Sequence, residues 1–193
     1  HLFRGTPTRM WLDWVFAEVF KLDVLLDATS ADNYFDTITA ALAQPEFRPR
    51  ALFERYNIEV LATTEAPLDT LDHHQAIRAS GWKGRVITAY RPDPVVDPEF
   101  EGFIENLTTL SELTGEDAFN YAGYLTAHRK RRAFFAAMGA TSTDHGHPTA
   151  ATADLSPQAA QQLFARVIKP GVSASDAELF RAHVRLDHAV DAV

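Results

Sequence analysis

The chain has 193 residues, which is long enough for one sizeable hydrophobic core or for one domain with a helical addition. Its net charge of −8 repels phosphate backbones, so the composition argues against a nucleic-acid partner. The lack of cysteine excludes disulfides and leaves His, Asp and Glu as metal ligands. Without a secretory signal or an apolar run of ~18 residues, we expect a cytoplasmic protein with no membrane partner.

The first part of the chain, residues 1–56, reads as a helical segment. Apolar residues recur there at helical spacing, and a first helix begins almost at once. Two further helices are expected over about 30–43 and 49–56. Trp11 and Trp14 lie on the first of these helices, and we expect both in the core.

Strand and helix patterns alternate over residues 57–193. Apolar runs at 58–65 and 85–90 predict buried parallel strands, and 139–146 is a weaker third candidate. The sequence thus predicts an α/β fold with about three parallel strands, since the crossovers are long enough for parallel pairing. Three strands cannot close an eight-stranded barrel of ~250 residues, so an incomplete barrel and a small open sheet both stay open. The helices expected in this part cover about 68–80, 98–114, 117–138, 156–168 and 173 onward.

Polar residues follow each predicted strand. Because the carboxyl ends of parallel strands meet at one edge of a sheet, these residues are expected to share a pocket. The candidate residues are Thr63, Thr64 and Glu65, then Arg91 and Asp93, then Asp144, His145 and His147.

Arg91 follows the second strand directly and precedes a rigid proline. Its planar fork of donors holds a carboxylate through two parallel hydrogen bonds, which predicts a clamp for an anionic substrate. The alternative is a structural ion pair of Arg91 with Asp93 or Glu65 that braces the loop. On the residues alone, the structural interpretation is slightly favoured.

His145 and His147 point the same way if their segment is extended, so both could reach one metal ion with Asp144 nearby. That arrangement would suit a small metal-dependent hydrolase. However, a catalytic zinc site needs a third ligand and supporting hydrogen bonds. The alternative is a turn in which Gly146 takes a positive φ. Either way, His145 lies near a strand end, where it can exchange a proton near neutral pH.

Two other features are interpreted as structural. The basic run 128–132 resembles a nucleic-acid patch, but within a helix of an acidic chain it predicts a solvated outer face. His73 and His74 are adjacent on a predicted helix, so they point about 100° apart and cannot share a metal ion.

Four segments carry a resemblance: LFRGTPTRMWLDWVFAEVF, RALFERYNIEVLATTEAPLDTLDHHQAIRASGW, ITAYRPD and GATSTDHGHPTAATADLS. Together they closely resemble uronate isomerase, also called glucuronate isomerase, of the amidohydrolase superfamily. The resemblance implies an aldose–ketose isomerase of glucuronate catabolism that converts D-glucuronate to D-fructuronate and D-galacturonate to D-tagaturonate. It also implies a distorted (β/α)8 TIM barrel with a helical insertion near its start, to which residues 1–56 would belong, with 57–193 forming part of the barrel.

The resemblance also implies roles for the site residues. Arg91 matches the arginine of the family's RPD segment, which contacts the uronate, and Asp144 and His145 match pocket-lining, substrate-binding positions. The family's divalent metal, expected to be zinc, is bound by residues outside the matched segments. The resemblance therefore implies no metal ligand and no cofactor in this chain, and it leaves the catalytic base unassigned.

The chain departs from the family pattern after about residue 183, and we interpret both of its ends as cuts in a longer protein. We expect such a piece to be inactive alone. It should also associate with itself, because an incomplete barrel exposes sheet edges and apolar faces. A non-catalytic module that binds a sugar acid through Arg91 is the remaining alternative.

Overall fold

The structure is a computed structural model that describes residues 3–190. The chain forms two compact units, His1–Glu59 and Val60–Val193. The outermost residues of the two predicted segments, 1–2 and 191–193, lie outside the described part. No helix within the described residues is long and apolar enough to cross a membrane.

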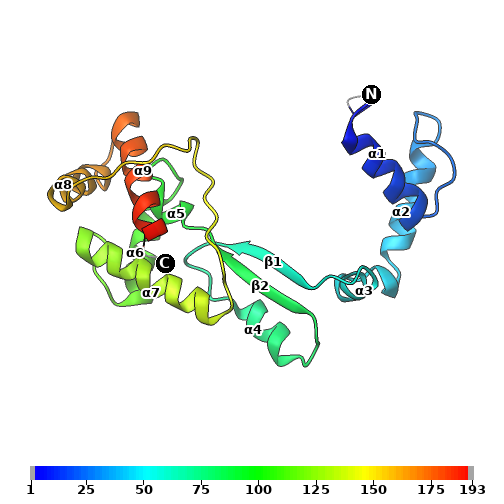
Figure 1. Cartoon of the computed structure of the whole chain (residues 1–193), viewed down its shortest axis with the longest axis horizontal. Helices are drawn as coiled ribbons and strands as arrows, with labels where there is room; N and C mark the ends of the chain where they lie inside the picture. The colour runs from blue at the N-terminus through cyan, green and yellow to red at the C-terminus, as the bar shows by residue number, and fades with distance from the viewer. Residues whose placement is uncertain (1–2, 191–193) are drawn as a thin grey trace. The chain divides into compact units, whose positions relative to one another are not determined.

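The first unit is helical (Figure 1). Its first helix begins at Pro7 because the side chain of Thr6 accepts a hydrogen bond from the backbone N–H of Arg9. The helical elements of this unit are α1 (Pro7–Trp14), its π-helical continuation η1 (Val15–Val19), α2 (Ala31–Leu42), the 3-10 turn η2 (Pro45–Phe47) and α3 (Pro49–Arg55).

This unit buries few side chains. Tyr34 is buried, its ring meets Phe16 edge-on at 5.0 Å, and its hydroxyl donates to the carbonyl oxygen of Val24. The prediction that Trp11 and Trp14 belong to a core is wrong for the described structure, because they are 63% and 55% exposed. Their helical spacing gives α1 an apolar face, but that face has no covering element in this structure.

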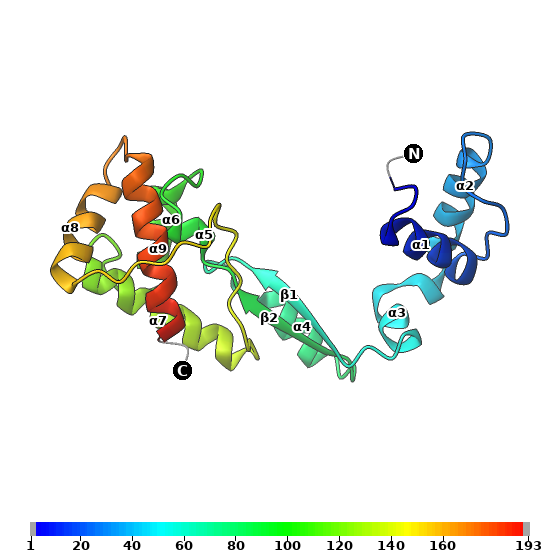
Figure 2. The ribbon, with the colours of Figure 1, turned by 45° about the horizontal axis from the view of Figure 1, so that its top comes forward.

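The second unit contains a parallel sheet of two strands, β1 (Val60–Glu65) and β2 (Arg85–Tyr90), in register from Val60–Arg85 to Glu65–Tyr90. Helix α4 (Asp72–Ala79) connects the strands and lies beside them (Figures 1 and 2). The predicted α/β class is confirmed, but the prediction of a third strand is wrong. The segment 139–146 contributes only an isolated parallel bridge between Thr143 and Tyr90.

Helices make up most of the rest of the second unit (Figure 2), and its larger core cluster is formed mainly by their side chains. Within this core the ring of Phe164 lies 4.8 Å from Tyr124 and 5.7 Å from Phe180. The helix predicted from residue 98 begins only after Gly102, which has a φ of 78°. The helices are α5 (Asp93–Val96), α6 (Phe103–Thr114), α7 (Tyr121–Ala137), α8 (Pro157–Val167) and α9 (Ala174–Val190).

The basic run on α7 is only partly the solvated face that the sequence predicted. Arg129 and Lys130 are exposed, but His128 and Arg131 are buried. Arg131 lies over the ring of Phe134 at 4.4 Å and donates to the carbonyl oxygens of Pro67 and Asp69. One arginine of the run thus fixes the loop between β1 and α4, which is a structural task that charge patterning does not reveal.

Candidate anion-binding site

Two loops meet beside the carboxyl end of β2. The backbone N–H of Arg91 donates to the carbonyl oxygen of Glu65 at 3.0 Å. The backbone N–H of Asp144 donates to the carbonyl oxygen of Tyr90 at 2.9 Å. These bonds fix the starts of the segments 91–93 and 144–147, so their side chains project from a common edge.

Asp93 connects the two loops. Its carboxylate accepts hydrogen bonds from the backbone N–H of Gly146, at 3.0 and 2.9 Å to the two oxygens, and from Arg91 Nε at 2.9 Å. His147 Nε2 lies 3.3 Å from the Oδ1 atom of Asp93. The ion pair between Arg91 and Asp93 that the sequence predicted as a brace is therefore present.

The Arg91 side chain is partly open to solvent, although Nη2 lies close to the backbone of Gly146. The side chain is 44% exposed, and its only hydrogen bond to the described residues uses Nε. Asp144 lies further off, with Oδ2 3.8 Å from Nε. A guanidinium that is anchored at Nε, and whose Nη groups form no hydrogen bond with the described residues, keeps donors that can bind a carboxylate. The bracing interaction and the clamp are thus compatible, because Asp93 orients the group that would bind the anion.

The residues predicted after the first strand do not all join this pocket. Thr88 Oγ1 donates to the carboxylate of Glu65, and His74 Nε2 lies 3.7 Å from Glu65 and 2.9 Å from Thr63 Oγ1. The prediction of one shared pocket is therefore wrong for Thr63 and Glu65. Alternate residues of a strand point to opposite faces, and this pair points toward α4.

Gly146 is needed here for space. Its φ is not positive, so the predicted left-handed turn is wrong. A Cβ atom at this position would lie 2.8 Å from Arg91 Nη2 and 2.8 Å from Asp93 Oδ2. A larger residue at this position would therefore have to displace the Arg91 and Asp93 side chains, which hold each other.

Gly146→Ala should therefore destabilise the second unit by about 1–2 kcal/mol, because the added methyl group overlaps two side chains that hold each other. Urea unfolding measures this loss. In a background carrying Arg91→Ala, where one of the two obstructing groups is absent, the same substitution should cost measurably less. Equal losses in the two backgrounds would show that the close approach to Arg91 is not what requires glycine.

The two histidines of the His-x-His pair are neutral near pH 7. Burial lowers the pKa of His145 to about 4, and burial also lowers the pKa of His147. Arg185 of α9 donates from Nη2 to His147 Nδ1 at 2.8 Å. A guanidinium has no acceptor atom, so His147 Nδ1 is the acceptor and the ring proton is on Nε2, which lies near Asp93 without a hydrogen bond to it.

Asp93, His145 and His147 offer ligand atoms within 4.8 Å of one another, a grouping that could hold a metal ion. Asp93 occupies the position in this group that the sequence assigned to Asp144. A metal-binding histidine normally donates its second N–H to an acceptor, whereas His147 accepts there from a cation and carries its proton on the nitrogen that would bind the metal. The group therefore does not fit a metal ion, which removes the support for a metal-dependent hydrolase.

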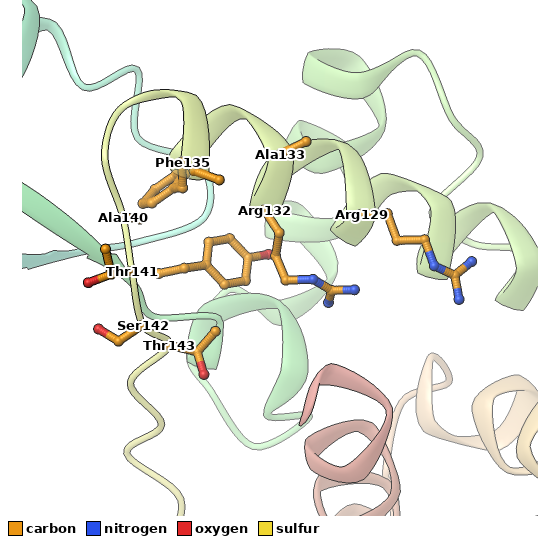
Figure 3. Close-up of a pocket in the computed structure, with 10 residues that line it drawn as sticks. Arg129, Arg132, Ala133, Phe135, Ala140, Thr141, Ser142 and Thr143 are labelled. Carbon is orange, nitrogen blue, oxygen red and sulfur yellow. The ribbon is translucent and has the colours of Figure 1, made fainter. Parts of the chain in front are cut away.

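A separate cavity of about 560 Å³ lies between α7 and the segment 140–143 (Figure 3). Its lining includes Arg129, Arg132, Thr141 and Ser142, which together suggest an anion site. Figure 3 shows Arg129 on the opposite side of the cavity from the hydroxyl groups of Thr141 and Ser142. Since these polar groups do not converge, the loops around Arg91 remain the better candidate.

Fold and site together define an α/β protein with an arginine, oriented by Asp93, at the carboxyl end of a parallel strand. A sequence model of the family described as glucuronate isomerase matches residues 1–188. The chain belongs to the glucuronate isomerase family.

Individual relatives support this assignment. The chain is 70% identical to the uronate isomerase of Sphingopyxis alaskensis over 95% of its length, and 64% identical to that of Xanthomonas campestris over 100% of its length. The crystal structure of glucuronate isomerase from Caulobacter crescentus superposes with a TM-score of 0.91 at 55% identity, covering 98% of this chain and 40% of that one. The uronate isomerase of Thermotoga maritima, at 21% identity and a TM-score of 0.86, shares the fold. The chain spans about 40% of the length of the curated relatives it matches.

Proposed function

We propose that these residues provide the substrate-carboxylate site of an aldose–ketose isomerase that acts on D-glucuronate and D-galacturonate. The family match supports the reaction class. The observation that carries the role of this chain is the orientation of Arg91: Asp93 fixes its Nε at 2.9 Å, while the side chain is 44% exposed and its Nη groups form no hydrogen bond with the described residues. The preferred uronate is not specified by these contacts.

In this proposal the chain supplies substrate-binding residues, whereas the catalytic base and the metal ligands come from other parts of the enzyme. Isomerisation moves a proton from C2 to C1 of the sugar through an enediol, which needs a base within ~3 Å of the C2 proton. We assign Arg91 to the carboxylate, and Asp144 and His145 to hydroxyl groups of the sugar. Asp144 is half-exposed and lies beside Arg91, whereas neutral His145 can both donate and accept. We assign no base to this chain and no ligand of the family's divalent metal, for which zinc is our expectation.

We also propose that residues 57–193 are part of a distorted (β/α)8 barrel and that residues 1–56 belong to its helical insertion. A parallel sheet of two strands, with a third segment bridging at one residue, supports an incomplete barrel. Val60 and Leu61 of β1 are partly exposed, which supports self-association through this strand. A piece of this kind should be inactive by itself.

Arg91→Lys should weaken the binding of D-glucuronate to the chain about tenfold, because an ammonium group cannot form two parallel hydrogen bonds with a carboxylate. Isothermal titration calorimetry measures the Kd. Arg129→Lys, an exposed change on α7, is the matched control and should leave the Kd unchanged. D-glucose, which lacks the carboxylate, should not bind. An unaltered Kd in Arg91→Lys, or equal binding of glucose, would exclude the proposed role.

A further inference from the structure

Arg185 ties the end of the site loop to helix α9. Its Nη2 donates to His147 Nδ1 at 2.8 Å and to the carbonyl oxygen of Thr149 at 2.7 Å. Its Nη1 donates to the carbonyl oxygen of Ala151 at 2.5 Å. All three acceptors lie within residues 147–151, so one side chain fixes both the path of this segment and the ring of His147.

The contact with His147 has a direction. Arginine only donates, so Nδ1 must offer its lone pair and the proton of the neutral ring is on Nε2. The protonated Nε2 lies 3.3 Å from Asp93 Oδ1, an electrostatic contact that is not aligned as a hydrogen bond, while the other carboxylate oxygen accepts from Arg91 Nε at 2.9 Å. In the opposite tautomer, the lone pair on His147 Nε2 would repel the nearby carboxylate oxygen of Asp93. The present orientation of the carboxylate would then be less favourable.

The contacts that lead from His147 through Asp93 to Arg91 are buried at His147 and exposed to solvent at Arg91. The side chain of His147 is 2% exposed and that of Asp93 is 13% exposed, whereas Arg91 is 44% exposed. Water therefore cannot readily replace His147 or Asp93 in their mutual contact, and the constraint ends at the partly exposed guanidinium of Arg91.

We propose that Arg185 is a positioning residue that sets the tautomer of His147 and thereby holds Asp93 and Arg91 in the orientation that receives a carboxylate. The part concerning a carboxylate rests on the proposed function. Arg185 touches neither the anion nor the reacting atoms in this scheme.

The test uses the whole 15N-labelled chain and two NMR readouts that need no ligand. In the wild-type chain, the ring nitrogens of His147 should show a protonated Nε2 and an unprotonated Nδ1. In Arg185→Met the ring should become a mixture of tautomers. Hydrogen exchange at Arg91 Nε should become about tenfold faster, the factor expected for losing one charge-assisted hydrogen bond. Arg185→Lys, which can still donate to Nδ1, should restore the tautomer.

Arg166→Met is the matched control. It removes an arginine that pairs with Asp176 of α9 away from the site, and both readouts should stay as in the wild type. A protonated Nδ1 in the wild-type chain, or an unchanged ring and unchanged Arg91 exchange in Arg185→Met, would overturn the inference.

Titration with D-glucuronate then separates the two proposals. We expect the Kd to rise about threefold to tenfold in Arg185→Met, with recovery in Arg185→Lys. If both NMR readouts change as expected but the wild-type chain binds no glucuronate, the positioning by Arg185 stands and the proposed function fails. If glucuronate binds through Arg91 but the NMR readouts do not change, the proposed function stands and the inference about Arg185 fails.

Discussion

Arg181→Met should lower the free energy of unfolding of the second unit by about 3 kcal/mol. The Arg181 side chain is 4% exposed and donates to three carboxylates, at 2.6 Å to Asp97, 2.8 Å to Glu99 and 2.9 Å to Glu178. Methionine preserves much of the apolar stem but leaves these acids without their shared cation. Losing one partner of a fully buried pair costs about 3–5 kcal/mol, and the partial exposure of the carboxylates places this case at the lower end.

Urea unfolding at pH 7 measures the loss, and an arginine on α8 that pairs with the same helix provides a control. Arg166 forms a bidentate pair with Asp176 of α9, at 2.9 Å for both bonds, but its side chain is 53% exposed. Arg166→Met should therefore cost less than about 1 kcal/mol. Equal losses in the two variants would mean that burial does not set the strength of the Arg181 network.

Arg181 also helps to hold the candidate site in place, because of its position on α9. Arg185 follows four residues later, so both arginines lie on one face of α9. Arg181 connects that face to the loop after α5, through Asp97 and Glu99. Arg185 connects it to the segment after His147. The two ends of the candidate site are therefore held by one helix, and a change that loosens α9 should loosen both.

The sequence predicts the part of the site that depends on strand patterning. The apolar run 85–90 is β2, so Arg91 does follow the carboxyl end of a parallel strand. The same alternation could have separated Thr63 and Glu65 from Arg91, because residues two apart share a face.

Other features of the site depend on contacts between distant parts of the chain, which no local sequence pattern predicts. Asp93 rather than Asp144 faces the two histidines, because the backbone of Gly146 passes close to Asp93 and donates to it. Arg185 lies nearly a hundred residues away along the chain from Arg91, and only the packing of α9 brings it to His147. The prediction of a third strand is wrong because Gly139 and the polar residues after it favour strand structure weakly. They form a single bridge to β2 and not a continuous ladder of hydrogen bonds.

Lowering the pH from 7.5 to 5 should reduce the free energy of unfolding by about 2 kcal/mol through His128 alone. His128 is fully buried, with Nδ1 2.9 Å from the hydroxyl of Tyr90. Burial, with smaller contributions from the nearby Arg132 and His145, lowers its pKa to about 3. The unfolded chain takes up the proton near pH 6.5, whereas the folded chain does not. Stability is therefore fully present above pH 6.5 and is lost as the pH falls toward 3.

The size of this effect does not depend on the precise folded pKa. At pH 5 the folded His128 is still neutral, so the loss equals the cost of protonating the unfolded chain, about 1.5 pH units below 6.5 at ~1.4 kcal/mol each. His145, with a pKa of about 4, adds a decline of its own. The pH profile of the wild type therefore combines the contributions of His128 and His145, and a variant of His128 separates them.

His128→Gln can still form a hydrogen bond with Tyr90 but does not titrate. It should be less stable than the wild type at pH 7.5, and its decline to pH 5 should be about 2 kcal/mol smaller, because the decline from His145 remains in both proteins. Urea unfolding across this pH range measures the difference, and His73→Gln, on the exposed face of α4, should keep the wild-type decline. If His128→Gln declined as steeply as the wild type, a buried neutral His128 could not be the source. The bond between Tyr90 and α7 would then have to tolerate a charge.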